Sequence, residues 1–432
     1  MVCWCITASG GGELVRTIDK KNLNLWLFVS GRFESLLGWA ALMVALPLYI
    51  LDLTGSGTMM GVFVLVGNLP RFFILPFAGV IGDRFNRKHL MVYLDLTKAT
   101  ALIFAYLFAI ANKLTLPVLL GFYGVFGVIN ALFDAPTSAM FADLVEAQKL
   151  RQAMSLNSAA TSIAQMIGPV VGGLLYGSVG MRNVLLFTAL FYLLSALSEV
   201  FIRYEHKRKD STIKVFKEIA DGVRFLFGHR GLRFLFSFAA LLNFIGAPLF
   251  GVVFPYIFRQ ELRFPAQAFG LIETVFMVGT LVGSVLVGTV LSKWSSKRLV
   301  VLGLIFQSFI GCLMSVVLWQ VRSSGMALIA VVSYIPLFLI GVLNMAINIP
   351  IGANLQMLVP SEIRSRVLSI LSLVSNGLTP IGSVIAGVLI DRMNSFFFFF
   401  VLSLILFVIS MAFVFIAPKE AFLSPESSSV SN

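Results

Sequence analysis

The chain has 432 residues, of which 58% are hydrophobic and 12% charged, and it carries a formal net charge of +12. Its mean hydropathy of +0.95 excludes a water-soluble globular domain and is typical of a protein that crosses a membrane several times. The positive charge does not indicate a nucleic-acid partner, because Lys and Arg fall in short polar stretches between apolar runs.

Twelve apolar stretches follow one another along the chain, each long enough to cross the hydrocarbon core of a bilayer as a helix of roughly 20 residues. Because the number is even, both termini lie on the same side of the membrane. The sequence therefore predicts an all-α membrane protein with twelve transmembrane helices. The expected spans are 24–51, 59–82, 89–111, 116–141, 154–178, 183–201, 234–258, 268–291, 299–319, 326–357, 367–390 and 395–416.

Lys and Arg are distributed unequally over the loops that connect these spans. The loops on one side, which also carries both termini, hold most of them. Positively charged loops stay on the cytoplasmic side of a membrane. We therefore expect both termini in the cytoplasm.

One long polar segment, 203–233, divides the spans into six and six. The halves repeat one another at constant spacing, and such repeats produce parallel six-helix bundles related by an axis along the membrane normal. We therefore expect two pseudo-symmetric bundles. The repeat is visible in the pairs Asn130 and Asn344, Pro136 and Pro350, Gly61 and Gly270, and Gly173 and Gly387.

These observations predict five regions. They are a cytoplasmic N-terminus (1–23), an N-terminal six-helix bundle (24–202), a cytoplasmic linker (203–233), a C-terminal six-helix bundle (234–416) and a cytoplasmic tail (417–432). The linker is expected to be a solvated helix, although its apolar positions also fit a helix that lies on the membrane surface.

The loop between the second and third spans concentrates charge. It reads Gly-Val-Ile-Gly-Asp-Arg-Phe-Asn-Arg-Lys over 79–88. This spacing resembles the signature loop of the major facilitator superfamily of secondary transporters, with Asn86 in place of the usual Gly. Asn tolerates a left-handed turn position, which we expect here. The alternative is an ordinary loop whose charges only fix orientation; the gating residues expected from the resemblance are Gly79, Asp83, Arg84, Arg87 and Lys88.

Ionisable side chains within the spans are costly and therefore candidates for function. Glu34 lies near the middle of the first span, and Arg71 of the second span is its expected ion-pair partner, since Arg32 is on another face of the same helix. A desolvated carboxylate exchanges protons nearer neutral pH than one in water. Glu34 is thus the expected proton carrier. Glu273 is the rival carboxylate, and because it lies nearer the outside it is expected instead to touch the substrate or an extracellular gate. The alternative for Glu34 is an ion pair that only locks two helices.

Three further ionisable residues lie nearer the cytoplasmic ends of the third and fourth spans. They are Asp95, Lys98 and Asp134, and we expect them to form a structural network that steadies an inner gate.

Glycine and proline are concentrated in the fifth span. The run Gly168-Pro169-Val170-Val171-Gly172-Gly173 is expected to interrupt this helix, because Pro removes a backbone hydrogen bond. It resembles the Gly-Pro motif of antiporters in the same superfamily. Helix packing alone is the equal alternative to a gating role. The residues expected to give flexibility are Gly168, Pro169, Gly172 and Gly173, with Pro380 and Gly382 as their counterparts.

No pattern indicates an enzyme, a metal site or a bound cofactor. The three histidines, His89, His206 and His229, have no metal-ligand spacing. A Gly-x4-Gly-Lys-Ser/Thr phosphate loop is also missing from the sequence, so we expect a proton gradient rather than ATP as the energy source.

Several further stretches resemble the branch of this superfamily that contains macrolide efflux pumps and siderophore exporters. They are Asp134-Ala135-Pro136-Thr137, Asp143-Leu144-Val145, Leu156-Asn157-Ser158, Gly168-Pro169 and the run from Val359 to Val367, where Ser365 replaces a usual Gly.

The resemblance implies proton-coupled export of an amphipathic small molecule by a multi-pass protein of the bacterial plasma membrane. The expected partners are this substrate, protons and membrane lipids, and the protein is expected to be a monomer. Two alternatives stay open. One is a flippase for lipids or lysophospholipids with the same fold, and the other is a membrane sensor that binds without transport.

Overall fold

The computed structural model describes residues 11–145, 148–204, 223–359 and 364–422. Over these residues the chain is helical, with no strand. The expected linker lies largely outside the described residues, as do the first ten residues and the last ten. The N-terminal half contains α1 (Gly11–Thr54), α2 (Gly57–Arg84), α3 (Arg87–Ile110), α4 (Leu116–Leu144) and α5 (Leu150–Val200).

The C-terminal half begins with a long helix of changing pitch. This helix consists of α7 (Arg230–Pro248), η1 (Leu249–Val253), α8 (Phe254–Tyr256) and η2 (Ile257–Glu261). The helices α9 (Ala266–Gly288), α10 (Ser296–Val321), α11 (Met326–Leu358), α12 (Arg364–Ile390), α13 (Ser395–Ile416) and η3 (Lys419–Phe422) follow.

Ten helical segments of the described part are long and apolar enough to cross a membrane. One of them, α5, contains two of the predicted spans, because Gly180 breaks the helix with a φ of 77° that glycine adopts without strain. The apolar part of α12 supplies the remaining span. The predicted all-α membrane fold with twelve spans is therefore confirmed.

Short polar side chains fix where several helices begin. Ser56 accepts a hydrogen bond from the backbone of Met59 and caps α2. Asn86 caps α3 by accepting from the backbone N–H groups of Lys88 and His89 at 3.1 and 3.4 Å. Its φ is −64°, so the predicted left-handed turn is wrong. The cap explains why Asn suits this position, since it satisfies helix donors that glycine cannot.

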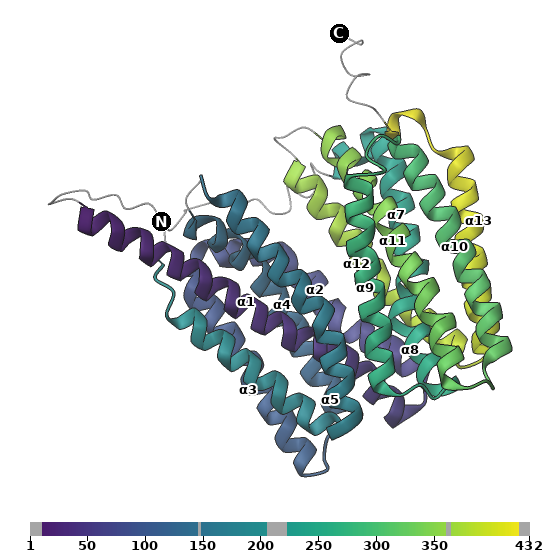
Figure 1. Ribbon diagram of the computed structural model, residues 1–432, viewed down its shortest axis with the longest axis horizontal. Helices are drawn as coiled ribbons and strands as arrows, with labels where there is room; N and C mark the ends of the chain where they lie inside the picture. The colour runs from purple at the N-terminus through teal and green to yellow at the C-terminus, as the bar shows by residue number, and fades with distance from the viewer. Residues whose placement is uncertain (1–10, 146–147, 205–222, 360–363, 423–432) are drawn as a thin grey trace, which may run out of the picture.

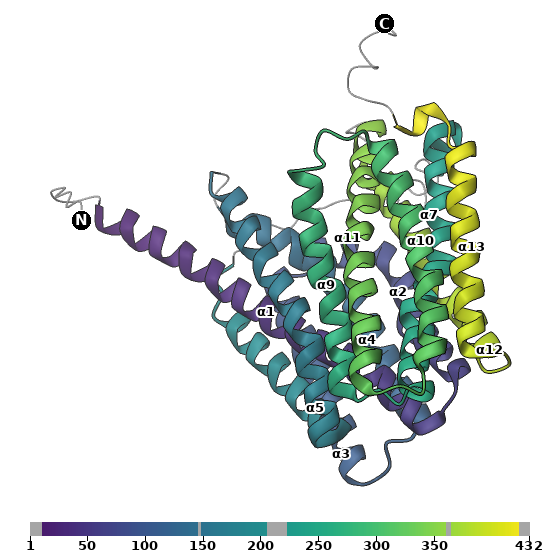
Figure 2. The same cartoon turned by 45° about the vertical axis from the view of Figure 1, so that its right-hand side comes forward.

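The two halves lie next to each other, and the beginning of α1 and the end of α13 are on the same side of the molecule (Figures 1 and 2). Contacts between the halves run mainly through α2 with α12 and through α5 with α9. Glycines allow both approaches. A Cβ on Gly61 would lie 2.5 Å from the carbonyl oxygen of Ser383, and one on its repeat counterpart Gly270 would overlap that of Pro169.

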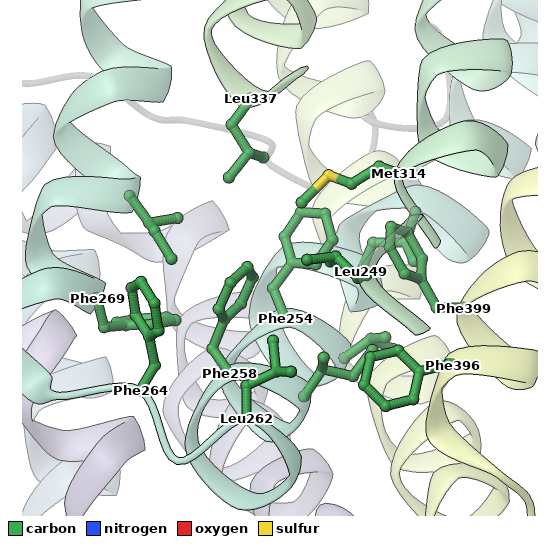
Figure 3. Packing of buried hydrophobic residues seen from close by; sticks show 14 of the residues in the cluster. Leu249, Phe254, Phe258, Leu262, Phe264, Phe269, Met314, Leu337, Phe396 and Phe399 are labelled. Carbon is green, nitrogen blue, oxygen red and sulfur yellow. The ribbon is translucent and has the colours of Figure 1, made fainter. Parts of the chain in front are cut away.

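Aromatic side chains fill the interior of the C-terminal half (Figure 3). The ring of Phe254 lies 5.2 Å from that of Phe399, and the ring of Phe258 lies 5.5 Å from that of Phe264. Close packing of this kind holds helices together where lipid removes the usual hydrophobic driving force. Some members of the cluster, among them Phe254 and Phe399, also line a cavity in the same half.

Candidate functional site

A cavity of about 520 Å³ lies within the C-terminal half. It is mostly apolar, with a few polar groups, which is the usual make-up of a small-molecule site. Its lining includes Leu242, Phe250, Phe276, Leu337, Asn243, Glu273, Gln307, Asn344, Asn348 and Ser403.

Several polar atoms of this cavity have no protein partner. The amide oxygen of Gln307 and the hydroxyl of Ser403 are buried without a hydrogen bond among the described residues. Glu273 adds a carboxylate that forms no ion pair with any of the described residues. An amphipathic molecule with a basic or hydrogen-bonding group would satisfy these atoms while its apolar body contacts the phenylalanine rings.

The charged residues predicted in α1, α2 and α4 meet in another arrangement than expected. Arg71 Nη2 lies 3.0 Å from Asp134 Oδ2, and Arg32 Nη2 lies 4.0 Å from Asp134 Oδ1. Glu34 instead faces α5, where its Oε2 is 3.5 Å from the hydroxyl of Ser198. The predicted Glu34–Arg71 pair is therefore wrong. The reason is that α2 packs on α4 while α1 packs on α5, so the two side chains face different neighbours.

Asp95 and Lys98 are in contact, with 3.2 Å between Nζ and Oδ1, and both are buried. They join Ser195 and Glu199 of α5 rather than Asp134, because Ser195 Oγ lies 2.7 Å from Asp95 Oδ2. Sequence reasoning missed Glu199, which lies close to the predicted end of its span. The signal that would have found it is an acidic residue one helical turn after Ser195 in an otherwise apolar run.

The charged loop after α2 is linked to the ends of two other helices. Arg87 Nη1 lies 2.7 Å from Asp143 Oδ2 near the end of α4. Tyr204, beyond the end of α5, donates to the same oxygen at 2.9 Å. Burial and the neighbouring Asp143 raise the pKa of Tyr204, so this phenol remains a donor at neutral pH. Gly79, Asp83 and Arg84 belong to the last turns of α2 and Lys88 to the first turn of α3. The side chains of Asp83 and Arg84 lie outside the described part.

The Gly-Pro run does not interrupt α5, which stays helical through Pro169 and breaks only at Gly180. The predicted interruption is wrong because the run serves close packing. A Cβ on Gly168 or Gly172 would overlap Ala40 or Ala41 of α1. On the opposite face, Gly173 contacts α9 of the other half.

Pro380 and Gly382 of α12 occupy equivalent positions to this run. The helix continues through Pro380. A Cβ on Gly382 would overlap the carbonyl oxygen of Phe244 in α7, so this glycine also allows two helices to approach closely.

The halves are joined at the ends of the helices that are remote from the termini. Arg259 holds Asp52 with two hydrogen bonds of 2.6 and 2.7 Å, a fork geometry that suits a guanidinium and a carboxylate. Tyr176 donates to Asp52 at 2.5 Å, and Gln260 donates to the carbonyl oxygen of Leu51 at 2.7 Å.

Asp391 forms a second link at the same end. Its carboxylate accepts from the backbone N–H groups of Gly57 at 2.6 Å and Thr58 at 2.9 Å, at the first turn of α2. The hydroxyls of Ser56 and Thr58 each add a bond of 2.7 Å. An acid from the C-terminal half thus caps a helix of the N-terminal half, where the helix dipole favours negative charge. Sequence analysis singled out neither this contact nor the one at Asp52, because both depend on which loops meet.

Comparison with known proteins shows which family the chain resembles. A family model described as "transmembrane secretion effector" matches residues 22–428. Macrolide efflux protein A of Streptococcus pyogenes is 25% identical over 382 residues, which cover 86% of this chain and 90% of that protein. The multidrug efflux pump Tap of Mycolicibacterium fortuitum is 26% identical, with coverage of 86% and 90%.

Solved structures with the same fold include two transporters of low sequence identity. A nucleoside transporter gives a TM-score of 0.73 at 14% identity, over 91% of this chain and 98% of that one. A bacterial homologue of the iron transporter ferroportin, in an inward-facing state, gives 0.70 at 17% identity, over 90% and 98%. At these identities the likeness shows the fold alone.

Proposed function

We propose, from the premise that the chain belongs to the transmembrane secretion effector family of the major facilitator superfamily, that it exports amphipathic small molecules and is driven by a proton gradient. The family makes it a membrane transporter and not an enzyme. We also propose that export proceeds by alternating access between the two sides of the bacterial plasma membrane.

The cavity in the C-terminal half carries the proposal for the substrate. Its volume of about 520 Å³ and its aromatic lining suit a compound of drug size. Glu273 supplies a single carboxylate, and the unpartnered oxygen of Gln307 supplies an acceptor. The names of the relatives, which include macrolide and multidrug efflux proteins, favour the same class of substrate.

The contacts at Asp52 and Asp391 support alternating access. If the termini are cytoplasmic, as the distribution of Lys and Arg indicates, these contacts lie on the extracellular side. They then hold this conformation closed to the outside. Export requires that they break once in each cycle, so the two halves must be able to separate at this end while they close at the other.

Glu34 remains the proposed proton carrier of α1. Its carboxylate is half-buried and has only the hydroxyl of Ser198 as a neighbour at hydrogen-bond distance among the described residues. Because no cation of the described residues forms an ion pair with it, a proton on Glu34 would not have to displace such a partner.

The test is transport by purified protein in inside-out proteoliposomes with an imposed pH gradient. The probes are a macrolide, the lipophilic cation tetraphenylphosphonium and a lysophospholipid. We expect accumulation of the first two that a protonophore abolishes. Accumulation of the lysophospholipid alone would replace this proposal with a lipid flippase, and binding of all three without accumulation would indicate a sensor.

In this assay, the variant Glu273→Gln tests whether the cavity is the substrate site. We expect the concentration of tetraphenylphosphonium needed for half-maximal transport to rise about tenfold, because loss of a close ionic contact to a ligand costs on the order of 1.4 kcal/mol or more. Glu261→Gln is the matched control, since Glu261 belongs to the same half but does not line the cavity. If both variants need the same concentration of tetraphenylphosphonium for half-maximal transport, Glu273 is excluded from the substrate site.

A further inference from the structure

The N-terminal half buries two carboxylates around one ammonium group. Asp95 and Lys98 of α3 are 0% and 3% exposed, and Glu199 of α5 is 1% exposed. Gly31 of α1 closes the site, since a Cβ there would lie 3.4 Å from Cγ of Glu199. If both acids are ionised, the buried cluster of Asp95, Lys98 and Glu199 carries a net charge of −1, which no further buried group of the cluster neutralises.

Lys98 already forms an ion pair with Asp95. Its Nζ lies 3.2 Å from Asp95 Oδ1 and faces the rings of Phe133 and Tyr192 at 4.0 and 5.0 Å from their centroids. Among the described side chains, no cation comes within 4.0 Å of Glu199, so this acid lacks an ion-pair partner of its own.

The other charged groups near the cluster do not neutralise its excess negative charge. Arg32 of α1 also interacts electrostatically with Glu199, but it lies 4.0 Å from Asp134 of α4, which also binds Arg71 at 3.0 Å. The side chains of Arg32 and Asp134 are 22% and 43% exposed. Solvent therefore screens them, whereas it does not reach Glu199.

The contacts of the Ser195 hydroxyl indicate which of the two acids carries a proton. A hydroxyl has one hydrogen to donate and lone pairs with which to accept. Ser195 Oγ lies 2.7 Å from Asp95 Oδ2 but 3.5 Å from Glu199 Oε1, so its hydrogen goes to Asp95. Its contact with Glu199 is favourable only if Glu199 is the donor. The second oxygen, Oε2, is buried without any hydrogen bond among the described residues, a position that suits a neutral acid and not a carboxylate.

We propose that Glu199 carries a proton in this conformation and that Glu199, Ser195 and Asp95 form a proton-binding site of the transport cycle. The inference rests on the proposed proton coupling and adds a buried site to the candidate at Glu34. A proton moves along the site when the O–H bond of Glu199 breaks toward Ser195 and Ser195 passes its own hydrogen to Asp95. Glu199 becomes the carboxylate and Asp95 the neutral acid, so the net charge around Lys98 is unchanged.

Infrared difference spectroscopy of the purified full-length protein tests the site without any transport measurement. A protonated carboxyl absorbs in a region free of amide and carboxylate bands and shifts in heavy water. We expect the wild type to show such a band at neutral pH, and Glu199→Gln to lose the intensity of one carboxyl per chain. Glu261→Gln is the control, because Glu261 is exposed and belongs to the other half, so its loss should leave the band of the buried acid unchanged.

Asp95→Asn provides a second, independent readout. Without the charge of Asp95, Lys98 needs another counterion, and Glu199 is the nearest acid that can supply it. The band of Glu199 should therefore disappear in Asp95→Asn even though Glu199 is still present. Band intensity that is unchanged in Glu199→Gln, or a loss of intensity there that Asp95→Asn does not reproduce, overturns the proposed site.

Transport assays distinguish a failure of this inference from a failure of the proposed function. If pH-driven export persists in Glu199→Gln at the wild-type rate, the site does not serve the cycle and this inference is wrong, whereas the proposed function stands. If the wild type exports nothing in response to a pH gradient but shows the Glu199 band, the proposed function is wrong, and with it the role of the site in the cycle, although the protonated Glu199 remains.

Discussion

The substitution Asp391→Asn should shift the protein toward a conformation in which the halves separate at the end remote from the termini. Asp391 accepts four hydrogen bonds from the loop and first turn of α2, three of them at Oδ2. Asn keeps one acceptor oxygen but places an NH₂ group against these donors and removes the charge at the helix terminus. The link between the halves is therefore weakened while the size of the side chain stays the same.

The magnitude follows from the contacts that are lost. Hydrogen bonds to charged groups contribute about 1.5–3 kcal/mol each when buried, and an anion at a helix N-terminus about 0.3–1 kcal/mol. Asp391 is largely exposed, so solvent compensates most of the loss. We expect a net change of about 1–2 kcal/mol, which is a factor of about 5–30 in the ratio of the two conformations.

Spin-label distances measure this ratio directly. Labels at Lys113 and Ser324 sit in exposed loops of the two halves at the end where Asp391 lies, in a background without the three native cysteines. The ratio of the longer-distance to the shorter-distance population should rise about 5- to 30-fold in Asp391→Asn. Arg392→Gln is the control, since it changes a neighbouring charge without touching the contact.

The contact also has a predictable pH dependence. Burial by itself raises the pKa of Asp391, but the hydrogen bonds from Thr58, Ser56 and Gly57 outweigh burial and lower it. A lowered pKa stabilises the linked conformation above the pKa of a free Asp, about 3.9. This stabilisation should be complete at pH 7 and should disappear as the pH falls below about 4. An unchanged distance distribution in Asp391→Asn, together with no acid-induced separation of the wild type, would refute the reasoning.

Three further predictions concern other parts of the protein. Gly270→Val should reduce the population of this conformation, because the new side chain would overlap the backbone at Pro169, and crosslinking between α5 and α9 would report the loss. Lys98→Met should lower the free energy of unfolding by about 3–5 kcal/mol, since it leaves Asp95 as an unpaired buried charge; thermal unfolding at neutral pH checks this, and an unchanged midpoint would contradict it. Asp83→Asn should slow turnover more than it weakens substrate binding if the charged loop gates the cytoplasmic side, and equal transport rates would remove that role.

The sequence by itself determined the membrane fold, because hydropathy over roughly 20 residues is a local property that no tertiary contact can reverse in a bilayer. It also indicated the family, since the charged loop at 79–88 and the Gly-Pro run are contiguous motifs. The repeat of glycines at constant spacing indicated two related halves, whereas only the structure showed that Gly61 and Gly270 both lie where the halves approach closely.

Only the tertiary structure decided which charges meet. Depth in the membrane suggested that Glu34 and Arg71 pair, but rotation of each helix about its axis directs Arg71 to Asp134 and Glu34 to Ser198. Residue number along a span gives depth and not direction toward a neighbour. The contact of Asp391 with α2 joins residues more than 330 positions apart, and the site at Glu199 requires α1, α3 and α5 to converge, which only the packing of whole helices can specify.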